Sequence, residues 1–190
     1  MIDSFIEYDE RLFLALNELH ATWLDPIMLW SSGNLLWLPL YAFLLYQLSR
    51  LPRIHTIVAL LCIAAGIALS DQLTSTVLKP LVARPRPTWN TELGPLVHTV
   101  NDYRGGHFGF PSSHAANTFC VAVLLILILR KRWFLWLLLW SAWVSYSRIY
   151  LGVHYPADVL IGALLGSGCG WIAFGLYKVG CRVGEKLTII

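Results

Sequence analysis

Long apolar runs separated by short polar segments dominate the pattern of the chain. A helix needs about 20 apolar residues to cross the hydrocarbon core of a bilayer, and five runs come close to that length. The pattern therefore predicts an all-α integral membrane protein, built as a bundle of five to six transmembrane helices. The five clear runs are 26–48, 56–78, 113–129, 133–151 and 157–177.

The first 22 residues have a different pattern, in which apolar and acidic positions share a helical spacing. This arrangement is typical of an amphipathic helix that lies on the membrane surface. We expect residues 1–22 to form such a helix and to act as an anchor. The apolar positions are Phe5, Ile6, Leu12, Phe13, Leu16 and Leu19, and the acidic ones are Asp3, Glu7, Asp9, Glu10 and Glu18.

The composition agrees with a membrane protein and argues against several other classes. Of the 190 residues, 57% are apolar and 13% are charged, whereas roughly a quarter of the residues in an average globular domain are charged. We therefore expect a single membrane domain over 1–190. The net charge of +3 is small and the basic residues are scattered, so we expect no nucleic-acid partner. The four cysteines lack the paired spacing of a zinc site, so we expect neither disulfides nor metal ligation.

Basic residues near the span ends predict the orientation, because lysine and arginine in short loops stay in the cytoplasm. They collect in two short connections and in the tail, which a five-span alternation puts on one side. The opposite, non-cytoplasmic side then holds the 1–22 helix, the 79–112 connection and the 152–156 turn. The cytoplasmic group consists of Arg50, Arg53, Arg130, Lys131, Arg132, Lys178, Arg182 and Lys186.

The 79–112 connection is the only long one between the predicted spans, and long ordered connections are usually functional. It is rich in proline and glycine, which favours turns and one short helix over strands. Three motifs at this non-cytoplasmic face carry chemistry. They are Lys79 followed after six residues by Arg86-Pro87, then Pro111-Ser112-Ser113-His114, and finally Ser147-Arg148 followed by His154 and Asp158.

The positive charges in these motifs suit a phosphate group. Guanidinium groups match phosphate oxygens in a bidentate fork, so Arg86 and Arg148, together with Lys79, would form a phosphate cradle. Ser112 and Ser113 open a predicted helix, whose free backbone N–H groups also favour an anion. Stabilising the charge on the phosphoryl oxygens is the main task of a phosphoryl-transfer site. We therefore expect the cradle to be catalytic.

Two histidines divide the remaining chemistry. Asp158 follows His154 by one helical turn, and a carboxylate that accepts from one ring nitrogen leaves the other nitrogen free to attack phosphorus. We therefore expect His154 to be the nucleophile and the intermediate to be a phosphohistidine. His114 would protonate the leaving group and later activate water. These groups suffice without a cofactor, and the chain lacks the carboxylate clusters that magnesium sites prefer, so no metal is expected.

With these motifs the chain resembles the type 2 phosphatidic acid phosphatase superfamily, whose signatures are Lys-x6-Arg-Pro, Pro-Ser-Gly-His and Ser-Arg-x5-His-x3-Asp. The resemblance implies a lipid phosphatase in the bacterial cytoplasmic membrane. Its substrate would be undecaprenyl diphosphate, phosphatidylglycerophosphate, phosphatidic acid or lipid A. Ser113 replaces the signature glycine, and its hydroxyl could add a donor to the phosphate site. The resemblance assigns phosphate binding to Lys79, Arg86, Ser112 and Arg148, acid catalysis to His114, nucleophilic attack to His154, and orientation of that histidine to Asp158.

Two other functions fit the same residues. A phosphotransferase would pass the phosphate from His154 to an acceptor other than water. A transporter or lipid-binding protein would use the cations only to recognise headgroups, and His154 and Asp158 would then be dispensable. Haloperoxidase activity fits a lipid-embedded chain least well.

Several residues near the motifs have no assigned role. Arg84 lies off the signature spacing and is open to a headgroup contact, while His107 is expected to face solvent in a flexible loop. The role of Arg104 and the oligomeric state stay open. Small residues on the last run are expected to pack helices within one molecule, and these are Gly162, Gly166 and Gly170.

Overall fold

The computed structural model describes residues 2–188, and within them all regular structure is helical. The one β-type contact in this range is an isolated bridge between Pro85 and Phe108. Residue 1 and residues 189–190, which the predicted domain of 1–190 includes, lie outside the described residues. The predicted all-helical class is confirmed.

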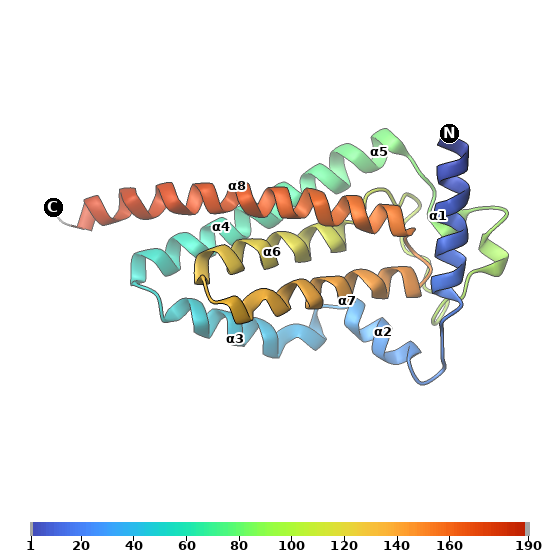
Figure 1. Ribbon diagram of the computed structural model, residues 1–190, viewed down its shortest axis with the longest axis horizontal. Helices are drawn as coiled ribbons and strands as arrows, with labels where there is room; N and C mark the ends of the chain where they lie inside the picture. The colour runs from blue at the N-terminus through green and yellow to red at the C-terminus, as the bar shows by residue number, and fades with distance from the viewer. Residues whose placement is uncertain (1, 189–190) are drawn as a thin grey trace.

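The long helices run side by side, and the N-terminal helix lies across one end of them (Figure 1). In the bundle, α4 (Arg53–Asp71) and α8 (Pro156–Thr188) flank α6 (Ser113–Leu129), and α7 (Trp136–Tyr150) packs beside α6. The C-terminal end of α8, where the described residues end, lies at the opposite end of the bundle from α1 (Ile2–Asn17).

The span predicted over 26–48 is not one continuous helix. It forms α2 (Asp25–Ser32) and α3 (Leu38–Ser49), with a bend of 78° between them. Gly33 ends α2 in an extended conformation, and its N–H bonds the carbonyl of Trp30. A proline in the first turn of α3 favours a new helix start there.

The second span is continuous but locally widened. Between α4 and α5 (Lys79–Val82), the segment Gln72–Leu78 forms a π-helical turn. Such turns are rare and frequently lie at functional sites. The span ends at Ala83, which adopts a left-handed conformation (φ 49°) and releases the chain into the long connection.

The number of spans stays a prediction. Among the described residues, two helices are long and apolar enough to cross a membrane, or three if the bent α2–α3 pair is one span. The helix α6 is apolar but has 17 residues, and α7 has 15. Both lie within the bundle beside the longer helices (Figure 1).

Glycines on α8 allow it to contact α6 at very short range. A Cβ atom on Gly162, Gly166 or Gly170 would come within 2.0–2.7 Å of a backbone carbonyl oxygen. The three oxygens belong to Ser112, just before α6, and to Ala116 and Cys120 within it. No side chain fits at that separation. The expectation that these small residues pack helices within one molecule is confirmed.

The N-terminal helix docks on the protein as well as presenting apolar residues outward. It ends at Asn17, five residues before the predicted boundary of 22. The Asn17 amide donates to the carbonyl of Tyr150 at the end of α7 (2.8 Å), and its oxygen accepts from the His98 N–H (2.8 Å). Phe13 is fully buried, whereas Phe5 and Tyr8 are exposed.

Candidate active site

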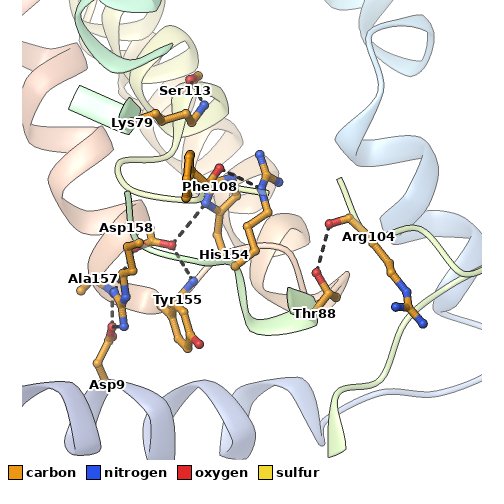
Figure 2. A network of polar contacts seen from close by, with 12 residues as sticks. Asp9, Lys79, Thr88, Arg104, Phe108, Ser113, His154, Tyr155, Ala157 and Asp158 are labelled. Atoms are coloured by element: carbon orange, nitrogen blue, oxygen red, sulfur yellow. Dashed lines mark hydrogen bonds and ion pairs between the residues drawn. The ribbon is translucent and has the colours of Figure 1, made fainter. Parts of the chain in front are cut away.

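The three motifs meet at the end of the bundle that α1 crosses (Figures 1 and 2). The long connection supplies Arg86, the start of α6 supplies the serines, and the turn between α7 and α8 supplies His154. The α8 helix begins at Pro156, as expected for a proline in a first helical turn. Residues about 80 positions apart in sequence therefore form one polar centre.

Two segments of the long connection pair with each other and thereby fix Arg86. The Arg86 N–H donates to the His107 carbonyl (3.0 Å), and the Gly109 N–H donates to the Arg84 carbonyl (2.9 Å). The buried Arg86 side chain then donates from Nε to the Phe108 carbonyl (3.1 Å). Gly105 has a left-handed φ of 65°, and a Cβ there would lie 2.6 Å from Arg86 Nη1. Only glycine fits beside this guanidinium.

Arg148 is held by groups from outside its own helix. It is 2% exposed, and its guanidinium donates to the Ser32 hydroxyl of α2 and to the Tyr103 hydroxyl of the long connection (3.1 Å). The α2 helix ends at Ser32, so the bend after α2 directly follows the residue that contacts Arg148.

The Ser113 hydroxyl holds Lys79. Lys79 Nζ donates to Ser113 Oγ at 2.6 Å, and the Thr74 hydroxyl donates to the same oxygen at 2.9 Å. A third hydrogen bond joins the Ser113 and Ser75 hydroxyls at 2.9 Å, and either hydroxyl can be the donor. The π-helical turn carries both Thr74 and Ser75, so this local widening and the serine in the glycine position together position Lys79.

Ser112 caps α6, and its own N–H donates to the Asp158 carbonyl (2.9 Å). Its buried hydroxyl has no hydrogen-bond partner among the described residues. The same holds for Arg86 Nη1 and Arg148 Nε. Buried donors are usually satisfied, so three free donors around one centre suit an anionic ligand.

His154 and Asp158 form a buried pair, 1% and 0% exposed. His154 Nδ1 lies 3.4 Å from Asp158 Oδ2, an oxygen that also accepts from the Tyr155 N–H (3.0 Å). This geometry orients the ring so that Nε2 is the free nitrogen.

The electrostatics of the site favour a neutral His154 among positively charged side chains. Burial lowers the pKa of His154 well below its ordinary value, and the nearby charges of Arg86, Arg148 and Lys79 act in the same direction. Burial, with the charge of Arg148, lowers the pKa of Arg86 to about 10, so Arg86 stays charged at neutral pH. A phosphate dianion would offset this excess positive charge.

His114 stands at the edge of the polar centre and faces a cavity of about 610 Å³. The cavity lies between α3, α4, α6 and α7, and most of its wall is apolar, including Trp37, Leu60 and Val144. The active site therefore adjoins a space suited to an apolar chain.

Sequence reasoning missed the residues that support the site from other segments. Arg84 is not a free headgroup contact, since it forms ion pairs with Asp9 (2.8 Å) and with Asp158 (3.0 Å). The exposed residues Arg104 and His107 lie nearby; the Arg104 carbonyl accepts from Thr88, and His107 lies against Trp89. No spacing rule links a residue of the N-terminal helix to the long connection, so only the fold could reveal Asp9.

Among the described residues, no group of three or more His, Cys, Asp or Glu is placed to hold a metal ion.

Residues 36–179 match the model of the PAP2 superfamily. A lipid A 4'-phosphatase of Bacteroides thetaiotaomicron is 43% identical over 196 residues, which cover 100% of this chain and 86% of the relative. A lipid A 4'-phosphatase of Porphyromonas gingivalis is 32% identical, with 93% and 75% covered. The crystal structure of Aquifex aeolicus LpxE superposes with a TM-score of 0.63 at 27% identity, covering 87% of this chain and 93% of that one. Because the family match and both relatives extend over most of the sequence, the chain belongs to the PAP2 superfamily and is a membrane lipid phosphatase.

Proposed function

We propose that this protein removes the phosphate monoester from a lipid A-type glycolipid, with His154 as nucleophile, at the non-cytoplasmic face of a bacterial inner membrane. The observation that carries the chemistry is the buried His154–Asp158 pair beside three cationic side chains. Support for the glycolipid comes from the relative that is 43% identical over this whole chain, a lipid A 4'-phosphatase.

In the first step the phosphate occupies the cradle of Lys79, Arg86 and Arg148, with the Ser112 hydroxyl as a further donor. His154 Nε2 attacks phosphorus, and the bond between phosphorus and the lipid oxygen breaks. His114 gives a proton to the departing oxygen, so the lipid leaves as an alcohol. The chain's own cations neutralise the charge that accumulates on the phosphoryl oxygens.

In the second step water attacks the phosphohistidine. His114, now neutral, takes a proton from that water, and the bond between phosphorus and Nε2 breaks to release inorganic phosphate. Asp158 holds the His154 ring in one orientation through both steps, because its carboxylate faces Nδ1.

The apolar cavity supports a lipid substrate. It begins at His114, where the leaving group would lie, and extends along α3 and α4 past Leu44 and Leu60. An acyl chain in this space would stay out of water while the headgroup phosphate reaches His154.

The distribution of basic residues supports the non-cytoplasmic orientation. The connection between α3 and α4, the connection between α6 and α7, and the described end of α8 all lie at one end of the bundle (Figure 1). These segments carry the basic groups around 50–53 and 130–132 and in the tail. The active site lies at the other end, beside α1.

Phosphate release by the purified protein in detergent tests the proposal. The substrates are bis-phosphorylated lipid A, undecaprenyl diphosphate, phosphatidylglycerophosphate and phosphatidic acid, each with EDTA, and mass spectrometry locates the phosphate that lipid A loses. We expect the fastest release from the 4' position and a loss of at least about a thousandfold in His154→Gln. Preference for another lipid would overturn the substrate, and activity that survives in His154→Gln or requires a metal would overturn the mechanism.

A further inference from the structure

Arg84 lies between two buried carboxylates that come from opposite ends of the sequence. Its Nη2 is 2.8 Å from Asp9 Oδ2, and its Nη1 is 3.0 Å from Asp158 Oδ1. Asp9 is 4% exposed although it belongs to a helix whose outer face is open. Figure 2 shows the Asp9 side chain extending from α1 toward Asp158 and His154.

Asp9, Arg84 and Asp158 form a network, and each of the three side chains has a second contact that restricts it. Asp9 Oδ1 accepts from the Ala157 N–H at 2.9 Å, in the first turn of α8. The Arg84 guanidinium stacks on the Tyr155 ring, 3.8 Å from its centroid. Asp158 uses Oδ1 for Arg84 and Oδ2 for the nucleophile. The contacts thus run without a gap from the N-terminal helix to the His154 ring.

The charge balance of the network gives it a role beyond holding α1 in place. Two carboxylates and one guanidinium leave one net negative charge beside His154. The other side chains that act on this imidazole are Lys79, Arg86, Arg148 and His114, none of which is negative, and the Gly109 backbone forms a hydrogen bond with the ring. Without Asp9, Arg84 would cancel Asp158 entirely, so His154 would lose the negative charge that keeps its nitrogen basic enough to attack.

We propose that Asp9 and Arg84 are positioning residues of the hydrolysis, which fix the Asp158 carboxylate against His154 and keep its negative charge uncancelled. The N-terminal helix is then part of the catalytic apparatus, in addition to being a surface anchor. The inference rests on the proposed role of His154 and adds two residues that lie outside the three motifs.

The variant Asp9→Asn tests the proposal most directly, because it keeps the shape of the side chain and an oxygen for the Ala157 N–H. We expect kcat to fall by about tenfold, in the range seen for groups that orient a reacting residue, with KM unchanged because no group of Asp9 touches the phosphate. The acid limb of the kcat/KM profile should move to lower pH, since His154 loses a nearby negative charge. A purely structural role would not shift that limb.

The matched control is Glu7→Gln on the same helix. Glu7 is exposed and, among the described residues, its side chain pairs with Arg11 alone, one turn along, so kcat and the pH profile should stay as in the wild type. Arg84→Gln should lose more activity than Asp9→Asn, because it leaves two buried carboxylates without a cation. The double variant Asp9→Asn/Arg84→Gln should recover part of that loss.

Wild-type kcat and an unshifted limb in folded Asp9→Asn would overturn the inference. If Asp9→Asn does not fold, Arg84→Lys is used as the test variant instead, since lysine keeps the charge but cannot bridge both carboxylates. Full activity of Arg84→Lys would equally overturn the inference. Failure of the underlying phosphatase mechanism gives a different result, namely activity that persists in His154→Gln.

Discussion

At the residue scale, the side chains proposed to contact phosphate are held by hydrogen bonds with other residues, such as those of Arg148 with Ser32 and Tyr103. The motif residues could be predicted from sequence because their chemistry and spacing are local: His154 and Asp158 lie one helical turn apart. Tyr103 and Ser32 could not be predicted, since their contact with Arg148 depends on how distant segments fold. Ser113 was predicted as a possible donor to phosphate, and its three hydroxyl contacts suggest a different role.

The first prediction concerns the protonation of His154. Burial and the surrounding cations lower its pKa in the folded protein, whereas the unfolded chain has an ordinary value of about 6.5. The unfolded state therefore binds more protons as the pH falls through about 6.5, so this group makes the fold less stable below that pH. NMR of histidine-labelled protein in micelles, assigned with His154→Gln, should show His154 still neutral somewhat below pH 6.5. Protonation at or above that value would contradict the prediction.

The second prediction concerns Ser113. Ser113→Ala removes the oxygen to which Lys79 donates, so we expect kcat/KM for phosphate release to fall about tenfold, against about a hundredfold or more for Lys79→Ala. In the Lys79→Ala background, Ser113→Ala should have no further effect. Additive losses would instead mean that the hydroxyl contacts phosphate itself. Ser167→Ala is the matched control, because the Ser167 hydroxyl donates to the Ala163 carbonyl within α8.

At the scale of the elements, the length of the apolar runs predicted where the helices lie, whereas the breaks and the widened turn within them were seen only in the structure. The runs at 113–129 and 157–177 correspond to α6 and to the first two thirds of α8. The break after Ser32 falls in the short polar stretch 31–34, Ser-Ser-Gly-Asn, which is a turn signal. It was not predicted because the long apolar segments on both sides make 26–48 read as one span. The break nevertheless brings α2 to Arg148.

The third prediction tests the contact between α6 and α8. A Cβ on Gly166 would lie 2.0 Å from the Ala116 carbonyl oxygen, whereas a Cβ on Gly168 would have nothing within 4 Å. Gly166→Ala should therefore destabilise the protein by about 1–3 kcal/mol, and Gly168→Ala should leave the melting temperature equal or slightly higher. Thermal unfolding in one detergent compares the two. Equal melting temperatures would show that the helices can separate at little cost.

At the scale of the whole molecule, the candidate active site beside α1 and the basic connections lie at opposite ends of the bundle's long axis (Figure 1). Charge bias predicts which end faces the cytoplasm. Sequence alone could not predict that α1 would cross this end of the bundle and connect to Asp158 through Arg84, because this depends on the path of the long connection between α5 and α6.

The fourth prediction tests this orientation. All four native cysteines are buried, so single cysteines can be introduced at Gly106 in the long connection and at Lys131 between α6 and α7, both exposed. In intact spheroplasts, a membrane-impermeant maleimide should label Gly106→Cys and should label Lys131→Cys only after lysis. The reverse pattern would place the active site in the cytoplasm.

The central claim is that His154 carries the phosphate between lipid and water, and trapping that intermediate tests it most directly. His114→Ala should still be phosphorylated by radiolabelled p-nitrophenyl phosphate, whose leaving group needs no acid, but should hydrolyse the adduct slowly because the base is missing. We predict an acid-labile, alkali-stable label on His154 that is absent in the His114→Ala/His154→Gln double variant. A label on another residue, or turnover of this substrate without any protein-bound phosphate, would contradict the account.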